Sequence, residues 1–215
     1  MQKKERFSLF IDHFTENFPE PETELEYIDP FQLLIAVILS AQCTDKRINM
    51  VTPRLFREYP SPVMLAAAKP EEVYSLIKSV TYPNNKAKHL INMAGMLVDQ
   101  FDSRVPERVE DLRKLPGVGR KTAHVIASVI YNQPVMAVDT HVFRVSKRLG
   151  LADHKATTPL AVEKQLVAHI PEKYLSKAHH WLILHGRYVC TARSPRCREC
   201  GLSHLCKYFQ QNIKI

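Results

Sequence analysis

Four cysteines lie close together near the C-terminal end of this 215-residue sequence, with the spacing Cys-x6-Cys-x2-Cys-x5-Cys. They are Cys190, Cys197, Cys200 and Cys206, whereas the fifth cysteine, Cys43, lies far from them. Four thiolates in so short a segment can be the ligands of a structural zinc ion or of an iron–sulfur cluster. Only the middle pair has the x2 gap typical of zinc, so the spacing by itself leaves both metals open.

A second group of candidate residues is found in and after the segment Leu-Pro-Gly-Val-Gly at residues 115–119. Glycine can adopt backbone angles closed to other residues, so Gly117 and Gly119 predict a tight turn between two helices. Without side chains there, backbone N–H groups at the positive end of the second helix can approach a phosphate closely. An ordinary corner between helices is the alternative, and the cations of Arg120 and Lys121 favour phosphate binding.

Lys121 and Asp139 are the candidates for catalysis. A neutral lysine amine is a nucleophile, and the positive end of a helix dipole favours that neutral form. Lysines on helix surfaces are usually solvated charges, so a catalytic role for Lys121 requires a partner. Asp139 precedes a helical segment and would cap it, which is compatible with holding an ionised carboxylate against a developing positive charge.

The elements that position these residues are predicted to be helices. Apolar residues recur at helical spacing, prolines stand at the start of many segments, and alternating strand-like runs are missing. The expected fold class is therefore all-α, with residues 31–39 as a core helix that is apolar on nearly every face. The predicted helices span residues 3–17, 30–43, 46–58, 62–67, 70–79, 84–101, 107–114, 120–131, 139–149, 159–168 and 172–188.

Composition and charge favour a globular protein with a polyanionic partner. Hydrophobic residues make up 45% of the chain and charged residues 24%, which argues against disordered and fibrous classes. The formal net charge of +8 suits nucleic acid, although a merely basic globular protein would share it. The longest apolar run, residues 33–39, is too short to cross a bilayer, and no secretory signal is evident. We therefore expect a cytoplasmic, reducing environment.

Four separate stretches, in one order along nearly the whole chain, carry a family resemblance. They are LSAQCTD at residues 39–45, LPGVGRKTA at 115–123, AVDTHVFRV at 137–145, and HHWLILHGRY at 179–188, which leads into the cysteines. Together they resemble the endonuclease III branch of the helix-hairpin-helix DNA glycosylases. Four motifs in the family's order leave little room for an accidental match.

The resemblance implies two helical domains that flank a DNA-binding cleft. A six-helix barrel with the helix-hairpin-helix would span residues 23–134, and a cluster domain would join residues 1–22 to 135–215. Lys121 and Asp139 would face each other across the cleft, and Gly117, Gly119 and Arg120 would contact DNA. The resemblance also settles the metal question in favour of a structural [4Fe–4S] cluster on the four cysteines.

The implied activity is that of a bifunctional DNA glycosylase and abasic-site lyase of base excision repair, with oxidised pyrimidines as the expected damage. The damaged nucleotide would be flipped into a pocket, Lys121 would attack the sugar C1′, and the Schiff base would permit β-elimination. Asp139 would assist, and Gln42 would fill the hole left by the flipped base, unless it is simply a polar residue ending a buried helix. The expected partner is damaged double-stranded DNA, bound by a nucleoid-associated monomer.

One loop departs from the family pattern. The family usually has a glycine, a bulky apolar residue and an aromatic residue before Lys-Ala, whereas this chain has Val-Thr-Tyr-Pro-Asn-Asn-Lys-Ala at residues 80–87. Thr81 replaces the glycine and Tyr82 the leucine-like wedge, so the resemblance does not predict the opposite-base preference. We expect Tyr82 to be exposed and to stack beside the unpaired base, the alternative being a core aromatic.

Two other functions fit part of the sequence. A mismatch adenine glycosylase shares the cluster but lacks the nucleophilic lysine and normally carries a further C-terminal domain. Lys121 and the length of this chain therefore argue against it. A non-catalytic DNA-binding module would use the glycine turn and the cluster only to hold the duplex, and the pairing of Lys121 with Asp139 argues against that function.

Overall fold

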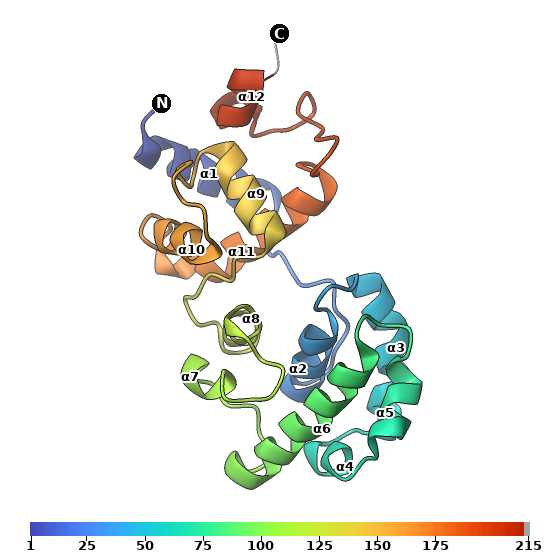
Figure 1. Ribbon diagram of the computed structural model, residues 1–215. Coiled ribbons are helices and arrows are strands. Elements are labelled where there is room, and N and C mark those ends of the chain that lie inside the picture. The colour runs from blue at the N-terminus through green and yellow to red at the C-terminus, as the bar shows by residue number, and fades with distance from the viewer. Residues whose placement is uncertain (213–215) are drawn as a thin grey trace. The chain divides into compact units, whose positions relative to one another are not determined.

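The computed structural model describes residues 1–212, and every regular element in that range is helical (Figure 1). The all-α fold class is therefore confirmed. The helices are α1 Lys3–Asn17, α2 Pro30–Leu39, α3 Asp45–Glu58, α4 Pro62–Ala66, α5 Pro70–Ile77, α6 Pro83–Gln100, α7 Val109–Leu112, α8 Arg120–Tyr131, α9 Thr140–Leu149, α10 Pro159–Val167, α11 Glu172–Tyr188 and α12 Lys207–Asn212, with a 3-10 helix η1 at Ser203–Leu205. None of the helices in residues 1–212 is both long and apolar enough to cross a membrane.

The chain folds into two compact units. The middle unit consists of Thr23–Tyr131, and the terminal unit joins Met1–Glu22 to the chain from Asn132 to the end of the described residues. The boundary after Tyr131 falls slightly before the position 134 expected from the sequence. Each unit has its own buried core, so the two candidate catalytic residues, Lys121 and Asp139, are positioned by different cores.

Helix α2 lies at the centre of the middle unit. Its start is set by Asp29, whose carboxylate accepts a hydrogen bond from the Gln32 N–H at 2.8 Å, and by Pro30 in the first turn. Every residue from Phe31 to Leu39 is buried, and α3, α6 and α8 pack around the helix. A helix that is apolar on all faces needs such surroundings, and the prediction of a central core helix is confirmed.

The end of α2 differs from the sequence-based prediction, which extended the helix to residue 43. The helix ends at Leu39, because Gln42 adopts a left-handed backbone conformation with a φ of 57°. A right-handed helix cannot continue through such a residue. Thr44 then starts α3 by accepting a hydrogen bond from the Arg47 N–H at 3.3 Å. Residues 40–43 therefore form an exposed or half-exposed turn between two helices.

An aromatic cluster ties the N-terminal helix to the rest of the terminal unit. The Trp181 ring, only 1% exposed, stacks on Phe14 at a centroid distance of 5.5 Å and meets Phe10 edge-on at 6.2 Å. Its indole N–H donates to the Phe18 carbonyl at 2.7 Å, which satisfies the polar end of the ring. These contacts explain why a segment at the start of the chain packs with α11, near its other end.

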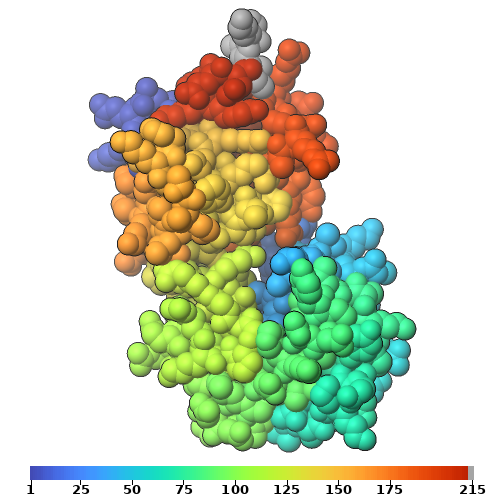
Figure 2. Space-filling model, viewed as in Figure 1, coloured from blue at the N-terminus to red at the C-terminus, as the bar shows by residue number. Residues whose placement is uncertain are grey.

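The C-terminal segment is fastened to the same unit by two arginines. The buried Arg6 of α1 donates its Nε–H to the Leu205 carbonyl at 2.9 Å. The Arg148 guanidinium of α9 lies over the Tyr208 ring of α12, 4.7 Å from the ring centroid. Figure 2 shows α12, in red, lying against α9, in yellow. The loop that carries the cysteines is thus held at its far end by cation–π and hydrogen-bond contacts.

Candidate functional site

The turn between α7 and α8 uses its two glycines differently. Gly117 has a φ of 80°, and a Cβ added there would lie 3.0 Å from the Cβ of His89. Gly119 has no left-handed angle, and a Cβ added there would meet open space. The predicted turn between two helices is present, and of its two glycines only Gly117 adopts an angle closed to other residues. Neither folding strain nor packing within the chain requires a glycine at position 119.

Lys121 lies in the first turn of α8, as predicted, and its side chain is exposed. The following residues of the helix, Ala123 to Ser128, are all buried. The Gly119 carbonyl accepts the Ala123 N–H at 2.9 Å, so the helical bonding begins directly before Arg120. Core packing therefore fixes the backbone of this turn, while the exposed Lys121 lies at the positive end of the helix.

Asp139 is the N-cap of α9. Its Oδ1 accepts a hydrogen bond from the Val142 N–H at 2.7 Å, so the capping function considered from the sequence is confirmed. The chain before it is also restrained, because the buried His179 bonds through Nδ1 to the Ala137 carbonyl at 2.9 Å. The carboxylate is half-buried and held by α9, an arrangement that suits a rigid anionic group.

Gln42 and Tyr82 lie in two turns of the middle unit that are bonded to each other. The Thr81 hydroxyl is 3.0 Å from the Ala41 carbonyl and 3.2 Å from the Gln42 carbonyl. Both Gln42 and Tyr82 are exposed, and Tyr82 is 63% exposed, so the alternative of a core aromatic is wrong. Gln42 does not end a buried helix either, because α2 stops at Leu39.

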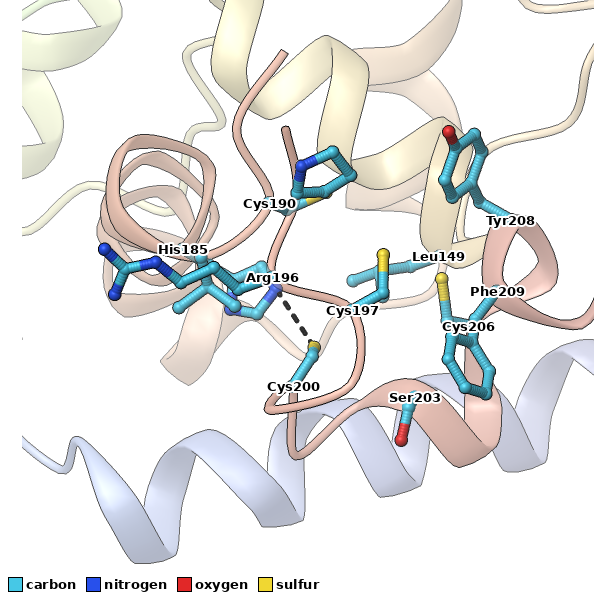
Figure 3. Close-up of a pocket in the computed structure, with 12 residues that line it drawn as sticks. Leu149, His185, Cys190, Arg196, Cys197, Cys200, Ser203, Cys206, Tyr208 and Phe209 are labelled. Atoms are coloured by element: carbon cyan, nitrogen blue, oxygen red, sulfur yellow. Dashed lines mark hydrogen bonds between the residues drawn. The ribbon is translucent and has the colours of Figure 1, made fainter. Parts of the chain in front are cut away.

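The four C-terminal cysteines line one pocket of the terminal unit. Figure 3 shows them on the loop after α11, with Cys190, Cys197, Cys200 and Cys206 arranged around a common space. All four are free thiols. Within residues 1–212, no three His, Cys, Asp or Glu side chains lie close enough together to bind a single metal ion.

The four thiols that line this pocket can all ionise to thiolates only if a positive charge lies close to them. Burial raises the pKa of the Cys200 thiol to about 11, and its charged cysteine neighbours add to that increase. Burial likewise raises the pKa of Cys197 and of Cys206. Iron supplies the positive charge that stabilises thiolates, and four thiolates are the usual ligand set of a [4Fe–4S] cluster. The donor set and its surroundings therefore fit that group.

Two arginines of α9 support the start of the cysteine loop, and sequence reasoning missed them. Arg148 donates from Nη1 to the Thr191 carbonyl at 2.7 Å and to the Cys190 Sγ at 3.5 Å. Arg144 donates from Nη2 to the Gly186 carbonyl at 2.8 Å and from Nε to the Cys190 carbonyl at 3.2 Å. Their i,i+4 spacing, which places both on one face of α9, was the available signal.

Two family models match the chain. One, described as HhH-GPD superfamily base excision DNA repair protein, matches residues 35–172. The other, described as the iron–sulfur binding domain of endonuclease III, matches residues 190–206 and so includes all four clustered cysteines. The choice of an iron–sulfur cluster over zinc is confirmed by this match.

Similar sequences and similar solved structures belong to the same family as the two models. Endonuclease III of Rickettsia prowazekii is 48% identical over 196 residues, covering 91% of this chain and 92% of the relative. Endonuclease III of Bacillus subtilis is 44% identical over 214 residues, covering 100% of this chain and 97% of the relative. A solved structure of a trapped endonuclease III–DNA covalent intermediate matches with a TM-score of 0.93 and 44% identity, covering 100% of both chains. The chain belongs to the endonuclease III family of base excision DNA repair proteins.

Proposed function

We propose that Lys121 and Asp139 are the catalytic residues of this chain, which is a bifunctional DNA glycosylase and abasic-site lyase of base excision repair. The observation that carries the assignment is the place of Lys121. The exposed Lys121 lies at the positive end of α8, directly after a glycine turn in which no other atom of the chain fills the space beside Gly119. Backbone N–H groups at such a turn can bind a DNA phosphate and so bring a sugar to the amine.

The chemistry then follows from a lysine nucleophile. With the damaged nucleotide flipped out of the duplex, the Lys121 Nζ bonds to C1′ while the bond from C1′ to the base breaks. The base leaves with the electron pair and takes up a proton. Opening of the sugar ring gives an iminium ion, which acidifies the protons on C2′. Loss of one such proton expels the 3′ oxygen, and the strand is cut by β-elimination.

Asp139 contributes charge rather than a bond. The hydrogen bond from the Val142 N–H holds its carboxylate at the N-terminus of α9. An anion fixed in this way stabilises the positive charge that develops at the sugar without having to reorganise during the reaction. Because Asp139 belongs to the terminal unit and Lys121 to the middle unit, the proposal requires both units for catalysis.

The remaining site residues bind the damaged duplex. In this proposal Gly117, Gly119 and Arg120 hold a phosphate, while Gln42 and Tyr82 occupy the space vacated by the flipped base and stack beside its partner. The four cysteines hold the [4Fe–4S] cluster, which pins the loop after α11 and takes no part in base removal. The substrates would be oxidised pyrimidines and abasic sites in double-stranded DNA, processed by a monomer at the nucleoid.

Borohydride trapping on a duplex with one abasic site tests this proposal. The wild type should give a covalent protein–DNA adduct, because borohydride reduces the Schiff base to a stable amine. Lys121→Ala should bind the duplex and give no adduct, whereas Lys78→Ala, at another exposed lysine of the middle unit, should trap normally. An undiminished adduct with Lys121→Ala would refute the assignment. Release of adenine from a mismatch without any adduct would identify an adenine glycosylase instead.

A further inference from the structure

Lys86, at the start of α6, is a buried lysine whose ammonium is fully bonded within the protein. It is 6% exposed. Its Nζ donates to the Leu39 carbonyl at 2.8 Å, to the Ala41 carbonyl at 2.7 Å and to the Thr81 Oγ1 at 3.1 Å. An ammonium has three donors, so these three acceptors use its whole hydrogen-bonding capacity. Burial lowers the pKa of Lys86, as expected when a charged group loses water.

The acceptors of this ammonium belong to two separate turns of the middle unit. Leu39 is the last residue of α2, Ala41 lies in the turn that follows it, and Thr81 lies in the turn before α6. The Thr81 hydroxyl adds a direct link, because it donates toward the carbonyls of Ala41 and Gln42 at 3.0 and 3.2 Å. We call Lys86 and Thr81, with the carbonyls that they bind, the two-turn clamp. The clamp fastens the chain immediately beside Gln42 and Tyr82.

Both residues beside the clamp have unfavourable backbone conformations. Gln42 has a φ of 57° and Tyr82 a φ of 52°, a region that side chains other than glycine seldom occupy. Both side chains are exposed, so packing of their own side chains does not compensate for the strain. Strained conformations persist where the surrounding structure imposes them, and they gather at ligand-binding positions. The hydrogen bonds of the clamp can impose these conformations, because they hold Ala41 beside Gln42 and Thr81 beside Tyr82.

We propose that Lys86 and Thr81 are positioning residues that set the separation and direction of Gln42 and Tyr82, and thereby the preference of this protein for a duplex with an unpaired base. The inference rests on the proposed function, in which Gln42 and Tyr82 fill the gap in the duplex. Thr81 departs from the glycine of the family pattern described from the sequence, and a glycine would offer no hydroxyl. The Thr81 Oγ1 supplies the third acceptor of the Lys86 ammonium, which gives the Thr81-Tyr82 pair a function.

Thr81→Val is the most direct test, because valine has nearly the same shape but cannot hydrogen-bond. Thr81 is exposed, so the change leaves no cavity in the core. Thr81→Ser keeps the hydroxyl and is the rescue variant. Ser75→Ala, which removes the Ser75 hydroxyl bonded to the Glu72 carbonyl at 2.7 Å on α5, is the matched control. The readout is the ratio of affinities for a tetrahydrofuran abasic duplex and for the undamaged duplex, from fluorescence anisotropy at one salt concentration.

We expect Thr81→Val to lower this affinity ratio about tenfold, as loss of hydrogen bonds to a charged group implies. Thr81→Ser should restore the ratio, and Ser75→Ala should leave it at the wild-type value. A 2-aminopurine base opposite the abasic position should fluoresce more strongly in the Thr81→Val complex than in the wild-type complex, because its stacking on the protein is poorer.

A wild-type affinity ratio in Thr81→Val would overturn the proposal, whether or not the variant had lost thermal stability. Equal weakening on damaged and undamaged duplex is one way to obtain that unchanged ratio, and it describes a general loss of structure. Because binding requires no chemistry, the ratio reports on the clamp even if the wild type gives no borohydride adduct. That last result would refute only the catalytic assignment of Lys121.

Discussion

Replacing the two glycines of the α7–α8 turn one at a time should separate folding from phosphate binding. At Gly117 the φ of 80° forces an alanine into the left-handed region, at a cost of about 1–2 kcal/mol. Its Cβ would also stand 3.0 Å from the Cβ of His89, so a neighbour has to move. For a chain of this length we expect Gly117→Ala to lower the Tm by roughly 2–8 °C.

Gly119→Ala should have the opposite profile. The new Cβ meets open space and no left-handed angle is required, so the stability should change by at most about 1 kcal/mol, the size of a cap effect. In the proposed complex, however, the methyl group stands between the backbone N–H groups and a phosphate. Loss of one hydrogen bond to a charged group costs about 1.5–3 kcal/mol, which corresponds to a Kd raised about tenfold or more.

Thermal unfolding by circular dichroism, together with anisotropy titrations of an abasic-analogue duplex, measures both effects on the same samples. The titrations must share one salt concentration, because affinity for DNA depends steeply on salt. We expect Gly117→Ala mainly to lose stability, because an alanine keeps the backbone N–H at that position, and Gly119→Ala mainly to lose affinity. If Gly119→Ala unfolds as early as Gly117→Ala and binds the duplex as tightly as the wild type, glycine at 119 serves folding and the phosphate-binding function is wrong.

Three further outcomes follow from the site. Asp139→Asn should keep the α9 cap and slow base removal by about two orders of magnitude in single-turnover assays, whereas Asp29→Asn at the α2 cap should leave the rate of base removal unchanged. A wild-type rate in Asp139→Asn would show that Asp139 is only a capping residue. Anaerobically prepared protein should be brown, with close to four iron and four sulfide per chain, and Cys200→Ser should lose that colour and bind DNA more weakly; zinc instead of iron would contradict the cluster. Tyr82→Ala should weaken binding to abasic duplex about tenfold with little change for single-stranded DNA, while Tyr74→Ala on α5 should change neither; loss of stability alone would exclude stacking.

Helices with clear end signals could be predicted from the sequence. The bounds of α1, α8 and α11 agree with the predicted ranges 3–17, 120–131 and 172–188. Several other helices begin at a proline preceded by a residue in extended conformation, as at Ser61-Pro62 and Thr158-Pro159. In both pairs the hydroxyl of the first residue caps the helix, which combines two local signals at one position.

The predictions of helix bounds failed where a segment is held by contacts with distant parts of the sequence. The end of α2 was placed too late because Gln42, a residue without any preference for turns, is held in a left-handed conformation beside the clamp. Helix α12 was not predicted, since its six residues are too few to show a helical repeat and none of them is fully buried. It lies against α9, where Tyr208 is covered by the guanidinium of Arg148.

In the candidate site, too, residues with a local sequence signal could be predicted and residues that depend on long-range contacts could not. Lys121, Asp139 and the cysteines could be found because each stands in a short motif whose chemistry is visible in the sequence. Lys86 and Arg148 were missed because their partners are mostly backbone carbonyls of residues far away in the sequence. Every residue has a backbone carbonyl, so the sequence does not indicate which of them accepts a hydrogen bond. Residues that carry out chemistry are thus easier to predict than residues that hold them in position.

The most direct test of the central claim is to locate the covalent bond itself. The wild-type protein is trapped with borohydride on an abasic duplex, the adduct is digested with protease and nuclease, and the modified peptide is sequenced by mass spectrometry. The proposal predicts a reduced sugar fragment on Lys121, in the peptide that follows the Leu-Pro-Gly-Val-Gly turn. A fragment on the N-terminal amine of Met1 or on any other lysine would contradict it.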